Sequence, residues 1–266
     1  MDADLHLHST ASDGLVSPAD LAAALAARGV GAGALTDHDT CNGFPAFAAA
    51  AAEVGLYALC GAEIAAEQDG QEVHLLSYFL DVPGGPYQDM LQRLSQARLG
   101  RAEEMLRRLR KLGITLDEQE VLAAAQPGRP HVARAMVRAG HAADVRDAFG
   151  RYLSPGRPGY VSRWRPAAGD VIAFAHAARG ITTLAHPCRY RTVPLQALVL
   201  AGIDAVEAVH PSCAEAQTAA LHAAAVAAGL LITGGSDFHG KADDQPLGTY
   251  VLAGDEFDRL RARLGA

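Results

Sequence analysis

Short apolar segments alternate with alanine-rich, helix-forming segments along most of the chain. The stretch VSPADLAAALAARG predicts a helix that ends at Gly29, where a glycine can adopt the left-handed conformation that stops a helix. Ser17 can cap its start, and Pro18 and Asp20 suit its first turn. The apolar segment VGAGALT follows, and the same order returns after Gly180, Gly202 and Gly229. Short apolar strands that alternate with helices predict a parallel sheet covered on both faces.

Polar residues of the kind that bind metals follow these predicted strands. Asp37, His38 and Asp39 follow the first repeat, and later strands are followed by His186, His210, Asp237 and His239. The carboxyl ends of the strands meet at one mouth in a (β/α) barrel, whereas an open doubly wound sheet gathers ligands mainly at one switch point. Because about six strands are followed by such polar residues, we expect an α/β protein with a barrel rather than an open sheet.

The alternation stops in the middle of the chain, from about Asp81 to Ser162. PYQDMLQRLSQARLGRAEEMLRRLRKLG predicts one long amphipathic helix, and TLDEQEVLAAA, RPHVARAMVRAG and VRDAFGRYLS predict three shorter helices. We therefore expect a barrel domain made of residues 1–80 and 163–266. Residues 81–162 are expected to form a helical insertion that covers the barrel mouth.

Composition narrows the possible partners and the cellular location. The 266 residues carry a net charge of −7, so bulk charge does not favour nucleic acid and we expect no stable binding of duplex DNA. No apolar run reaches the ~18 residues that a membrane span needs, and the start of the chain has no signal-peptide pattern. The four cysteines show no CxxC spacing and are expected to be reduced thiols. These features predict a cytoplasmic protein that does not bind membranes.

Ten candidate ligands lie at or near predicted strand ends. Imidazole and carboxylate groups together suit zinc, manganese or iron. One catalytic ion takes three or four protein ligands, so this many groups imply two or three ions and at least one bridging carboxylate. His141, His176 and His222 lie in predicted helical stretches and are expected to have no such role. The candidates are His6, His8, Asp13, His38, Glu63, His74, His186, His210, Asp237 and His239.

Several of these motifs resemble one known family. DLHLHSTASDG, LTDHDT, GAEI, VHLLSYF, LAHP and GGSDFHG resemble, in this order, the PHP (polymerase and histidinol phosphatase) family of metal-dependent phosphoesterases. The likeness extends over nearly the whole chain, and the stand-alone bacterial branch that acts on nucleotides and short oligonucleotides is the most similar branch. GRPHVARAMV at 128–137 resembles the insertion of that branch. The resemblance implies a distorted (β/α)7 barrel of the TIM type.

The resemblance also implies how the ligands are shared among three ions. His6, His8 and Asp237 would bind the first ion, and Asp13, His38 and His239 the second. His74 and His186 would bind the third, and Glu63 matches the bridging carboxylate. His210 is outside the family's ligand set, so we interpret it as a phosphate contact or a proton donor. We expect two or three divalent ions of manganese, iron or zinc.

The expected reaction is hydrolysis of a nucleotide phosphate ester. The expected substrates are 3′,5′-bisphosphate nucleotides or the 5′ ends of short oligonucleotides, attacked by a hydroxide that bridges two ions. Arg129, His131 and Arg134, near a predicted helix start, could clamp a second phosphate. Histidinol-phosphate phosphatase is the main alternative, although Asp13 and the insertion count against it. A metal-binding module without turnover and an amidohydrolase are further alternatives; the intact ligand set counts against the module, and the missing lysine bridge counts against the amidohydrolase.

Overall fold

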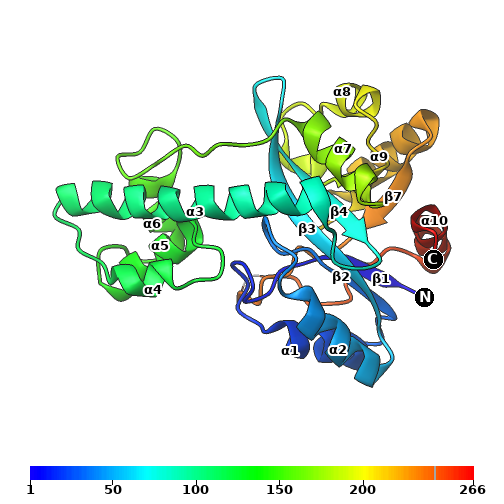
Figure 1. The fold of residues 1–266 in the computed structure, drawn as a ribbon, viewed down its shortest axis with the longest axis horizontal. Coiled ribbons are helices and arrows are strands. Elements are labelled where there is room, and N and C mark those ends of the chain that lie inside the picture. The colour runs from blue at the N-terminus through cyan, green and yellow to red at the C-terminus, as the bar shows by residue number, and fades with distance from the viewer. Residues whose placement is uncertain (243) are drawn as a thin grey trace. The chain divides into compact units, whose positions relative to one another are not determined.

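The chain forms two compact units in a computed structural model that describes residues 1–242 and 244–266. Residues 1–90 and 165–266 form the barrel unit, and residues 91–164 form the helical unit (Figure 1). The division falls within one long helix, α3 (Gly85–Lys111). Coverage of the barrel mouth by the helical unit stays a prediction.

In the part of the chain that the structure describes, one seven-stranded sheet forms the centre of the barrel unit, and its strands are neighbours in chain order. The sheet nearly closes, because Leu7 pairs in parallel with Phe238 and the backbone N–H of His8 donates to the Phe238 carbonyl at 2.9 Å. This arrangement confirms the predicted α/β barrel. The strands are β1 (Ala3–Leu7), β2 (Ala32–Leu35), β3 (Tyr57–Gln68), β4 (Gln71–Phe79), β5 (Ile181–Leu184), β6 (Ala205–Val209) and β7 (Leu231–Gly234).

The prediction of a wholly parallel sheet is wrong at β4. This strand pairs antiparallel with both β3 and β5. Only Asp69 and Gly70 separate β3 from β4, and both have a positive φ, at 51° and 78°. Two such residues make a tight hairpin turn, whereas a parallel neighbour needs a crossover of about a dozen residues or more. The reversal is one source of the barrel's distortion.

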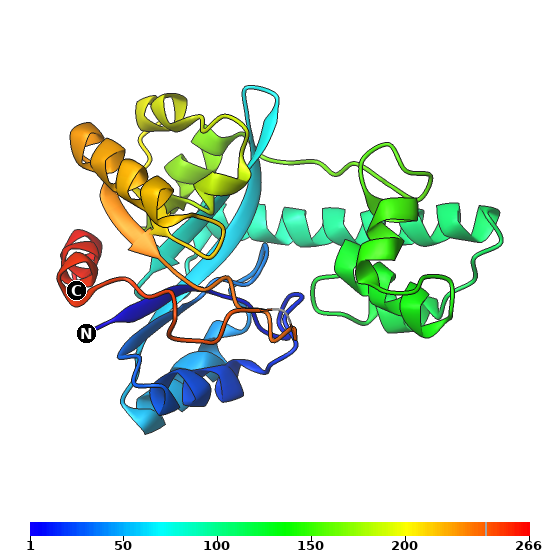
Figure 2. The ribbon, with the colours of Figure 1, turned by 180° about the vertical axis from the view of Figure 1, so that it is seen from behind.

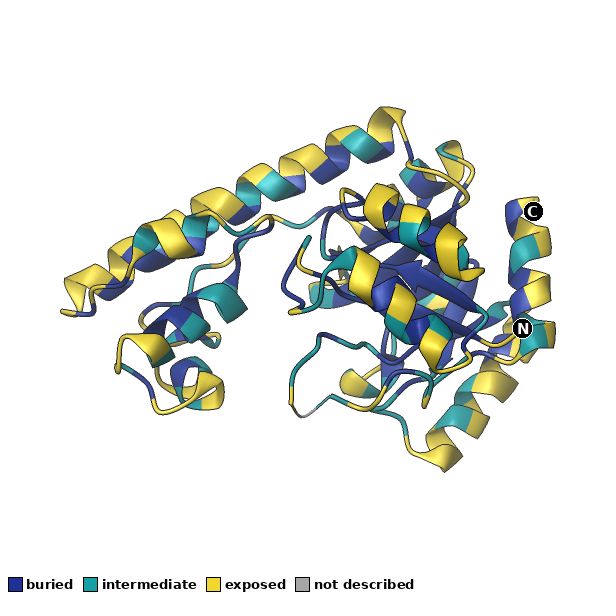
Figure 3. Ribbon diagram, turned by 90° about the horizontal axis from the view of Figure 1, so that it is seen from below, coloured by how far each residue is buried: buried dark blue, intermediate teal, exposed yellow. Residues whose placement is uncertain are grey.

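Among the described residues, six α-helices lie wholly in the barrel unit, and the first part of α3 belongs to it too. In Figures 1 and 2, α1 and α2 pack side by side. Figure 3 shows buried strands and helices whose outer faces are exposed. The predicted start of α1 is confirmed, because the Ser17 hydroxyl accepts from the Asp20 N–H at 3.2 Å. The helices are α1 (Pro18–Ala27), α2 (Phe44–Val54), α7 (Ala168–Ala177), α8 (Leu195–Leu200), α9 (Glu215–Ala228) and α10 (Gly254–Leu264).

The helical unit has its own apolar core. The second part of α3 packs its buried Met105 and Leu109 with Val132 and Met136 of α5. The Asp117 carboxylate caps α4 by accepting from the backbone N–H groups of residues 119 and 120. The predicted long helix and three shorter helices are confirmed. The short ones are α4 (Glu118–Leu122), α5 (Arg129–Arg138) and α6 (Val145–Ala148), which continues into a π-helical turn at Phe149–Leu153.

The prediction of four reduced thiols is wrong for two of the cysteines. Cys188 and Cys213 form a disulfide, with their Cα atoms 5.3 Å apart, and Cys41 and Cys60 are buried free thiols. The two cysteines are 25 residues apart in sequence and lie in the loops that follow β5 and β6, which are neighbouring strands of the sheet. Sequence spacing alone therefore did not indicate the pair. Among the described residues, no helix is both long and apolar enough to cross a membrane.

Candidate metal centre

All seven strands bring candidate ligands into the barrel unit. Glu63 and His74 lie on the hairpin strands β3 and β4, and His6 lies on β1. The other candidates lie in segments that follow a strand, as the sequence predicted. These are His8 and Asp13 after β1, His38 after β2, His186 after β5, His210 after β6, and Asp237 and His239 after β7.

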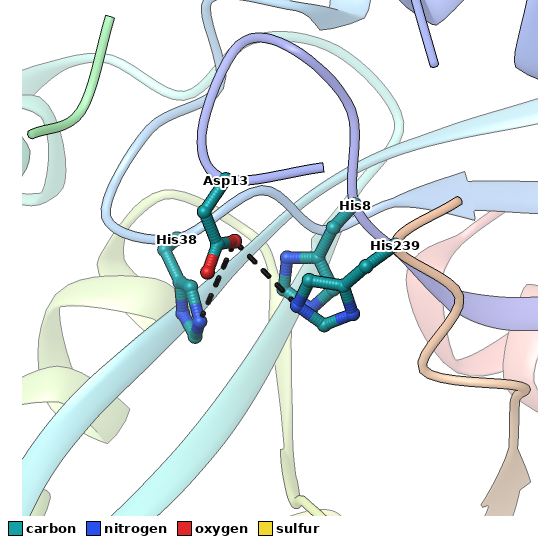
Figure 4. Close-up of side chains that lie close together, drawn as sticks. All are labelled: His8, Asp13, His38 and His239. Atoms are coloured by element: carbon teal, nitrogen blue, oxygen red, sulfur yellow. Dashed lines mark ion pairs between the residues drawn. The ribbon is translucent and has the colours of Figure 1, made fainter. Parts of the chain in front are cut away.

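The first group gathers around Asp13, and Figure 4 shows its side chains converging. Asp13 Oδ1 lies 3.5 Å from His239 Nε2 and 3.9 Å from His38 Nε2. The ring of His8 stacks on that of His239, with centroids 4.1 Å apart. Each of these four side chains offers one atom within 4.8 Å of the others, so the group could hold a metal ion.

Asp37 explains why Asp13 reaches this position. Its buried carboxylate accepts from the backbone N–H of Ser9 at 2.7 Å and from the Ser9 hydroxyl at 2.6 Å. It also accepts from the Ser12 hydroxyl at 2.5 Å. These bonds tie the loop after β1 to the end of β2, and the sequence prediction had assigned no role to Asp37.

The second group contains both histidines of the first motif. His6 and His8 lie two residues apart and extend their rings to the same side. Their Nε2 atoms lie 3.4 and 3.3 Å from Asp237 Oδ1. They lie 3.5 and 3.2 Å from Glu63 Oε2. Two imidazoles and two carboxylates thus face one point, from β1 and the segment after it, β3 and the segment after β7.

Glu63 connects this group to a third one. Its Oε1 lies 2.6 Å from His74 Nδ1 and 2.9 Å from His186 Nε2, whereas its Oε2 faces His6, His8 and His38. The two oxygens of one carboxylate therefore belong to different clusters. This division is what a carboxylate that bridges two metal ions requires.

The donor atoms fit divalent cations. The Nε2 atoms of His6 and His8 are buried and make no hydrogen bond among the described residues. Buried polar atoms are costly without a partner, and a cation at the point that they share would satisfy both. The structure thus brings together the nine residues predicted as ligands, while their binding of metal stays a prediction.

Electrostatics favour charged carboxylates at the centre. Burial raises the pKa of Glu63, but the facing histidines, His38 first, outweigh it and hold this pKa well below its usual range. The same balance lowers the pKa of Asp237. Burial lowers the pKa of His8, but Asp237 and Glu63 raise it to about 9. Two ionised carboxylates surrounded by imidazoles provide negative charge at the centre. A divalent cation that binds there would displace the protons from the imidazoles and balance this charge.

His210 lies at the wall of the same centre and presents one defined nitrogen to it. The backbone N–H of Ser212 donates to His210 Nδ1 at 2.9 Å. Because Nδ1 accepts, a neutral ring holds its proton on Nε2, which lies 3.6 Å from Asp237 Oδ2. A buried N–H directed at this centre suits the predicted phosphate contact or proton donor.

A cavity of about 400 Å³ opens onto the candidate ligands. Arg189 and Lys241 line it together with His38, Glu63, His74 and His186. The Arg189 guanidinium also contacts Asp237 Oδ2 at 2.8 Å. The sequence prediction missed Arg189, whose only signal was its place three residues after His186. A cavity of this size with two cationic side chains can admit a phosphate ester.

Glu207 is a second acid that the sequence prediction missed. It lies on β6, fully buried, with Oε1 2.9 Å from His6 Nδ1. Burial raises the pKa of Glu207, but the imidazoles of His6 and His210 lower it below its usual value. Its signal was a carboxylate inside the otherwise apolar strand segment AVEAV.

The predicted phosphate clamp lies in the helical unit. Arg129 and His131 are in the first turn of α5, Arg134 follows one turn later, and all three are partly exposed. The guanidinium of Arg129 lies 5.6 Å from the centroid of the Phe149 ring. These contacts lie within the helical unit, so the clamp stays a prediction.

Comparisons with known proteins agree with the geometry. The family model described as "PHP domain" matches residues 4–155. A 5′-3′ exoribonuclease of Haemophilus influenzae is 38% identical over 189 residues, which cover 70% of this chain and 69% of that protein. A 3′,5′-nucleoside bisphosphate phosphatase of Chromobacterium violaceum is 34% identical over 255 residues, or 89% of this chain and 86% of that protein.

Solved structures show the same fold. One from Bifidobacterium adolescentis, named for a metal-dependent phosphoesterase, has a TM-score of 0.91 at 31% identity and covers 98% of this chain and 96% of its own. Another, named as an amidohydrolase from Chromobacterium violaceum with bound sulfate and no metal, has a TM-score of 0.87 at 30% identity. The match covers 99% of this chain and 97% of that chain. The match of a family model over more than half of the chain, together with these relatives, shows that this chain belongs to the PHP domain family.

Proposed function

We propose that this chain is a metal-dependent hydrolase of nucleotide phosphate esters. The observation that supports it most is Glu63, whose two oxygens face two separate clusters of histidines. The proposed substrates are 3′,5′-bisphosphate nucleotides or the 5′ ends of short oligonucleotides. The names of the relatives from Chromobacterium violaceum and Haemophilus influenzae support this choice.

Two or three divalent ions of manganese, iron or zinc are proposed as cofactors. His6, His8 and Asp237 would hold the first ion, Asp13, His38 and His239 the second, and His74 and His186 the third, with Glu63 shared. When bound, such ions neutralise the charge of a phosphate ester and lower the pKa of water from 15.7 to about 7. The chain's own contribution is to hold its imidazoles and carboxylates in place, through contacts such as those of Asp37.

Arg189 would orient the ester in the cavity. A guanidinium offers a planar fork of donors that matches the oxygens of a phosphate. Its present partner, Asp237, also faces His6 and His8, so Arg189 lies within one side-chain length of the candidate ligands. It would therefore contact the phosphate that is hydrolysed.

His210 would protonate the leaving oxygen from Nε2. The acid is the imidazolium form of the ring, which gives its Nε2 proton to the leaving oxygen and becomes neutral, while the Ser212 hydroxyl, 2.8 Å from Nδ1, can accept a hydrogen bond from the proton that stays. The test compares His210→Asn on nucleotides and on p-nitrophenyl phosphate, whose leaving group needs no proton. We expect kcat to fall about 100-fold or more on nucleotides and much less on p-nitrophenyl phosphate. Equal losses on both substrates would exclude the acid role and leave a role in binding.

Arg129, His131 and Arg134 would clamp a second phosphate. In this proposal, Arg129→Ala raises KM for a bisphosphate nucleotide about tenfold more than KM for AMP, because a charge-assisted hydrogen bond is lost. Arg138→Ala is the matched control, since Arg138 is an exposed arginine on the same helix that pairs with Glu120. An unchanged ratio of the two KM values in Arg129→Ala would exclude the clamp.

The function itself is tested by metal analysis and turnover of anaerobically purified protein. Adenosine 3′,5′-bisphosphate, AMP, histidinol phosphate and a 5′-phosphorylated RNA oligomer are compared. We expect phosphate or nucleotide release from a nucleotide substrate, and a loss of about 100-fold or more in Glu63→Gln. Glu67→Gln, an exposed carboxylate on the same strand, should keep full activity. Absence of turnover on every substrate, with metals restored, would refute the proposal and support the module without turnover.

A further inference from the structure

Glu207 is a buried carboxylate that the proposed chemistry does not yet use. It lies on β6, and its side chain has no exposed surface. Its Oε1 lies 2.9 Å from Nδ1 of His6, a residue 201 positions away on β1. Its Oε2 accepts the backbone N–H of His186 at 2.6 Å. One side chain thus contacts two of the histidines that face the candidate metal centre.

The contact with His6 determines which nitrogen faces the centre. An ionised carboxylate accepts and cannot donate, so Nδ1 of a neutral His6 holds the proton. The lone pair of Nε2 is then directed toward Asp237 Oδ1, 3.4 Å away, and Glu63 Oε2, 3.5 Å away. A carboxylate partner of this kind fixes the tautomer and the orientation of a histidine that binds a metal, and it makes the ring a better donor.

The contact with His186 holds an unfavourable backbone conformation. His186 has φ 32° and ψ 56°, in the left-handed region that residues with a side chain rarely adopt. Such a conformation is unfavourable and persists only where neighbouring groups enforce it. The short bond from the His186 N–H to Glu207 supplies this restraint, and it aims the ring so that Nε2 lies 2.9 Å from Glu63 Oε1.

A carboxylate is required here because two N–H donors, those of His6 Nδ1 and the His186 backbone, each need an acceptor oxygen. Glutamine offers one oxygen, and its NH₂ group would face either His6 Nδ1 or the His186 N–H. In the structure, both oxygens of Glu207 already have partners, His6 Nδ1 at 2.9 Å and the His186 N–H at 2.6 Å. This use of both oxygens favours a supporting role over direct binding of an ion, although His210 also lies near Glu207 and His6.

We infer that Glu207 is a positioning residue that sets His6 Nε2 and the His186 ring for metal binding. This inference rests on the proposed function, because it assumes that these histidines bind divalent ions. It adds a residue outside the ligand set. Glu207 acts through two candidate ligands, one on β1 and one in the loop after β5.

The test measures metal affinity in Glu207→Gln and Glu207→Ala by competition with a chelator, using Mn²⁺ and Zn²⁺. We expect affinity to fall 10- to 100-fold, the usual range for loss of such a partner. At saturating metal, the number of bound ions should equal that of the wild type and turnover should recover. In Zn²⁺-loaded protein, long-range nitrogen-15 spectra should show the His6 proton on Nδ1 in the wild type and a changed Nδ1 signal in both variants.

Asp204→Asn is the matched control. Asp204 is another buried carboxylate next to β6, and it accepts from the Thr182 N–H at 2.8 Å and contacts His176 at 2.7 Å. Its loss should lower the unfolding temperature while metal affinity stays within about twofold of the wild type. If Asp204→Asn weakens metal binding as much as Glu207→Gln, general destabilisation explains the effect and the inference is overturned.

Other outcomes separate the inference from the function on which it rests. Unchanged metal affinity in both Glu207 variants would overturn the positioning role. One ion fewer at saturating metal would make Glu207 a ligand instead, which also overturns it. A wild-type protein that binds ions but hydrolyses no phosphate ester would refute the proposed function alone. A wild-type protein that binds no divalent ion would overturn both.

Discussion

The disulfide between Cys188 and Cys213 joins two loops that contain His186 and His210. Breaking it, by a phosphine reductant or by Cys188→Ser with Cys213→Ser, should destabilise the fold. In the chain-entropy model, a crosslink between residues 25 apart lowers the entropy of the unfolded chain enough to stabilise the protein by about 3.5 kcal/mol. The unfolding entropy of 266 residues, at about 2.1 cal/mol/K each, is ~0.56 kcal/mol/K. The expected decrease in unfolding temperature is therefore about 6 °C.

Calorimetry of the chelator-treated protein, with and without the phosphine, measures this decrease without a contribution from bound metal. Thiol titration in denaturant should give two thiols before reduction, from Cys41 and Cys60, and four afterwards. The double serine variant provides the control, because the phosphine should not change its unfolding temperature. Four titratable thiols together with an unchanged unfolding temperature would refute the reasoning, since the crosslink would then add nothing to stability. Four thiols before reduction would show that the disulfide is absent.

Four further perturbations have defined outcomes. Gly235→Ala would place a Cβ 2.4 Å from the backbone nitrogen of His6, so we expect a loss of about 1–3 kcal/mol in denaturant unfolding and weaker metal binding. Gly100→Ala, at an open position in α3, should instead stabilise by about 0.5–1 kcal/mol, and equal effects of the two changes would contradict the packing argument. Asp117→Ala removes the cap of α4 and should cost about 1 kcal/mol, seen as faster amide exchange in residues 118–122; unchanged exchange would exclude the cap's role. Metal removal by a chelator should abolish turnover reversibly and lower stability by about 2.7 kcal/mol relative to metal at 100 times its Kd, and activity that survives complete removal would refute metal dependence.

Local features of the chain were sufficient for many elements. Ser17 and Gly29 predict the start and the end of α1 because a hydroxyl cap and a left-handed glycine act within one turn of the helix. The candidate ligands were predictable for a similar reason. A polar group such as His38 or His186, directly after an apolar strand, lies where the strands of a barrel converge.

The reversed strand β4 was also within reach of the sequence. Asp69-Gly70 is a strong hairpin signal between two strand-forming segments. The prediction of a parallel sheet gave more weight to the repeated helices than to this turn. The hairpin places Glu63 and His74 on adjacent strands, which lets one carboxylate face two clusters.

By itself, the sequence determined the barrel class, the positions of most helices and strands, and the nine candidate ligands, because caps, turns and strand ends are local. Only the tertiary structure decided the disulfide, the role of Asp37 in holding the loop of Asp13, and the contact of Glu207 with both His6 and His186. Each of these joins different strands or the loops that follow them. Such partners are chosen by the register and closure of the sheet, which no stretch of sequence contains.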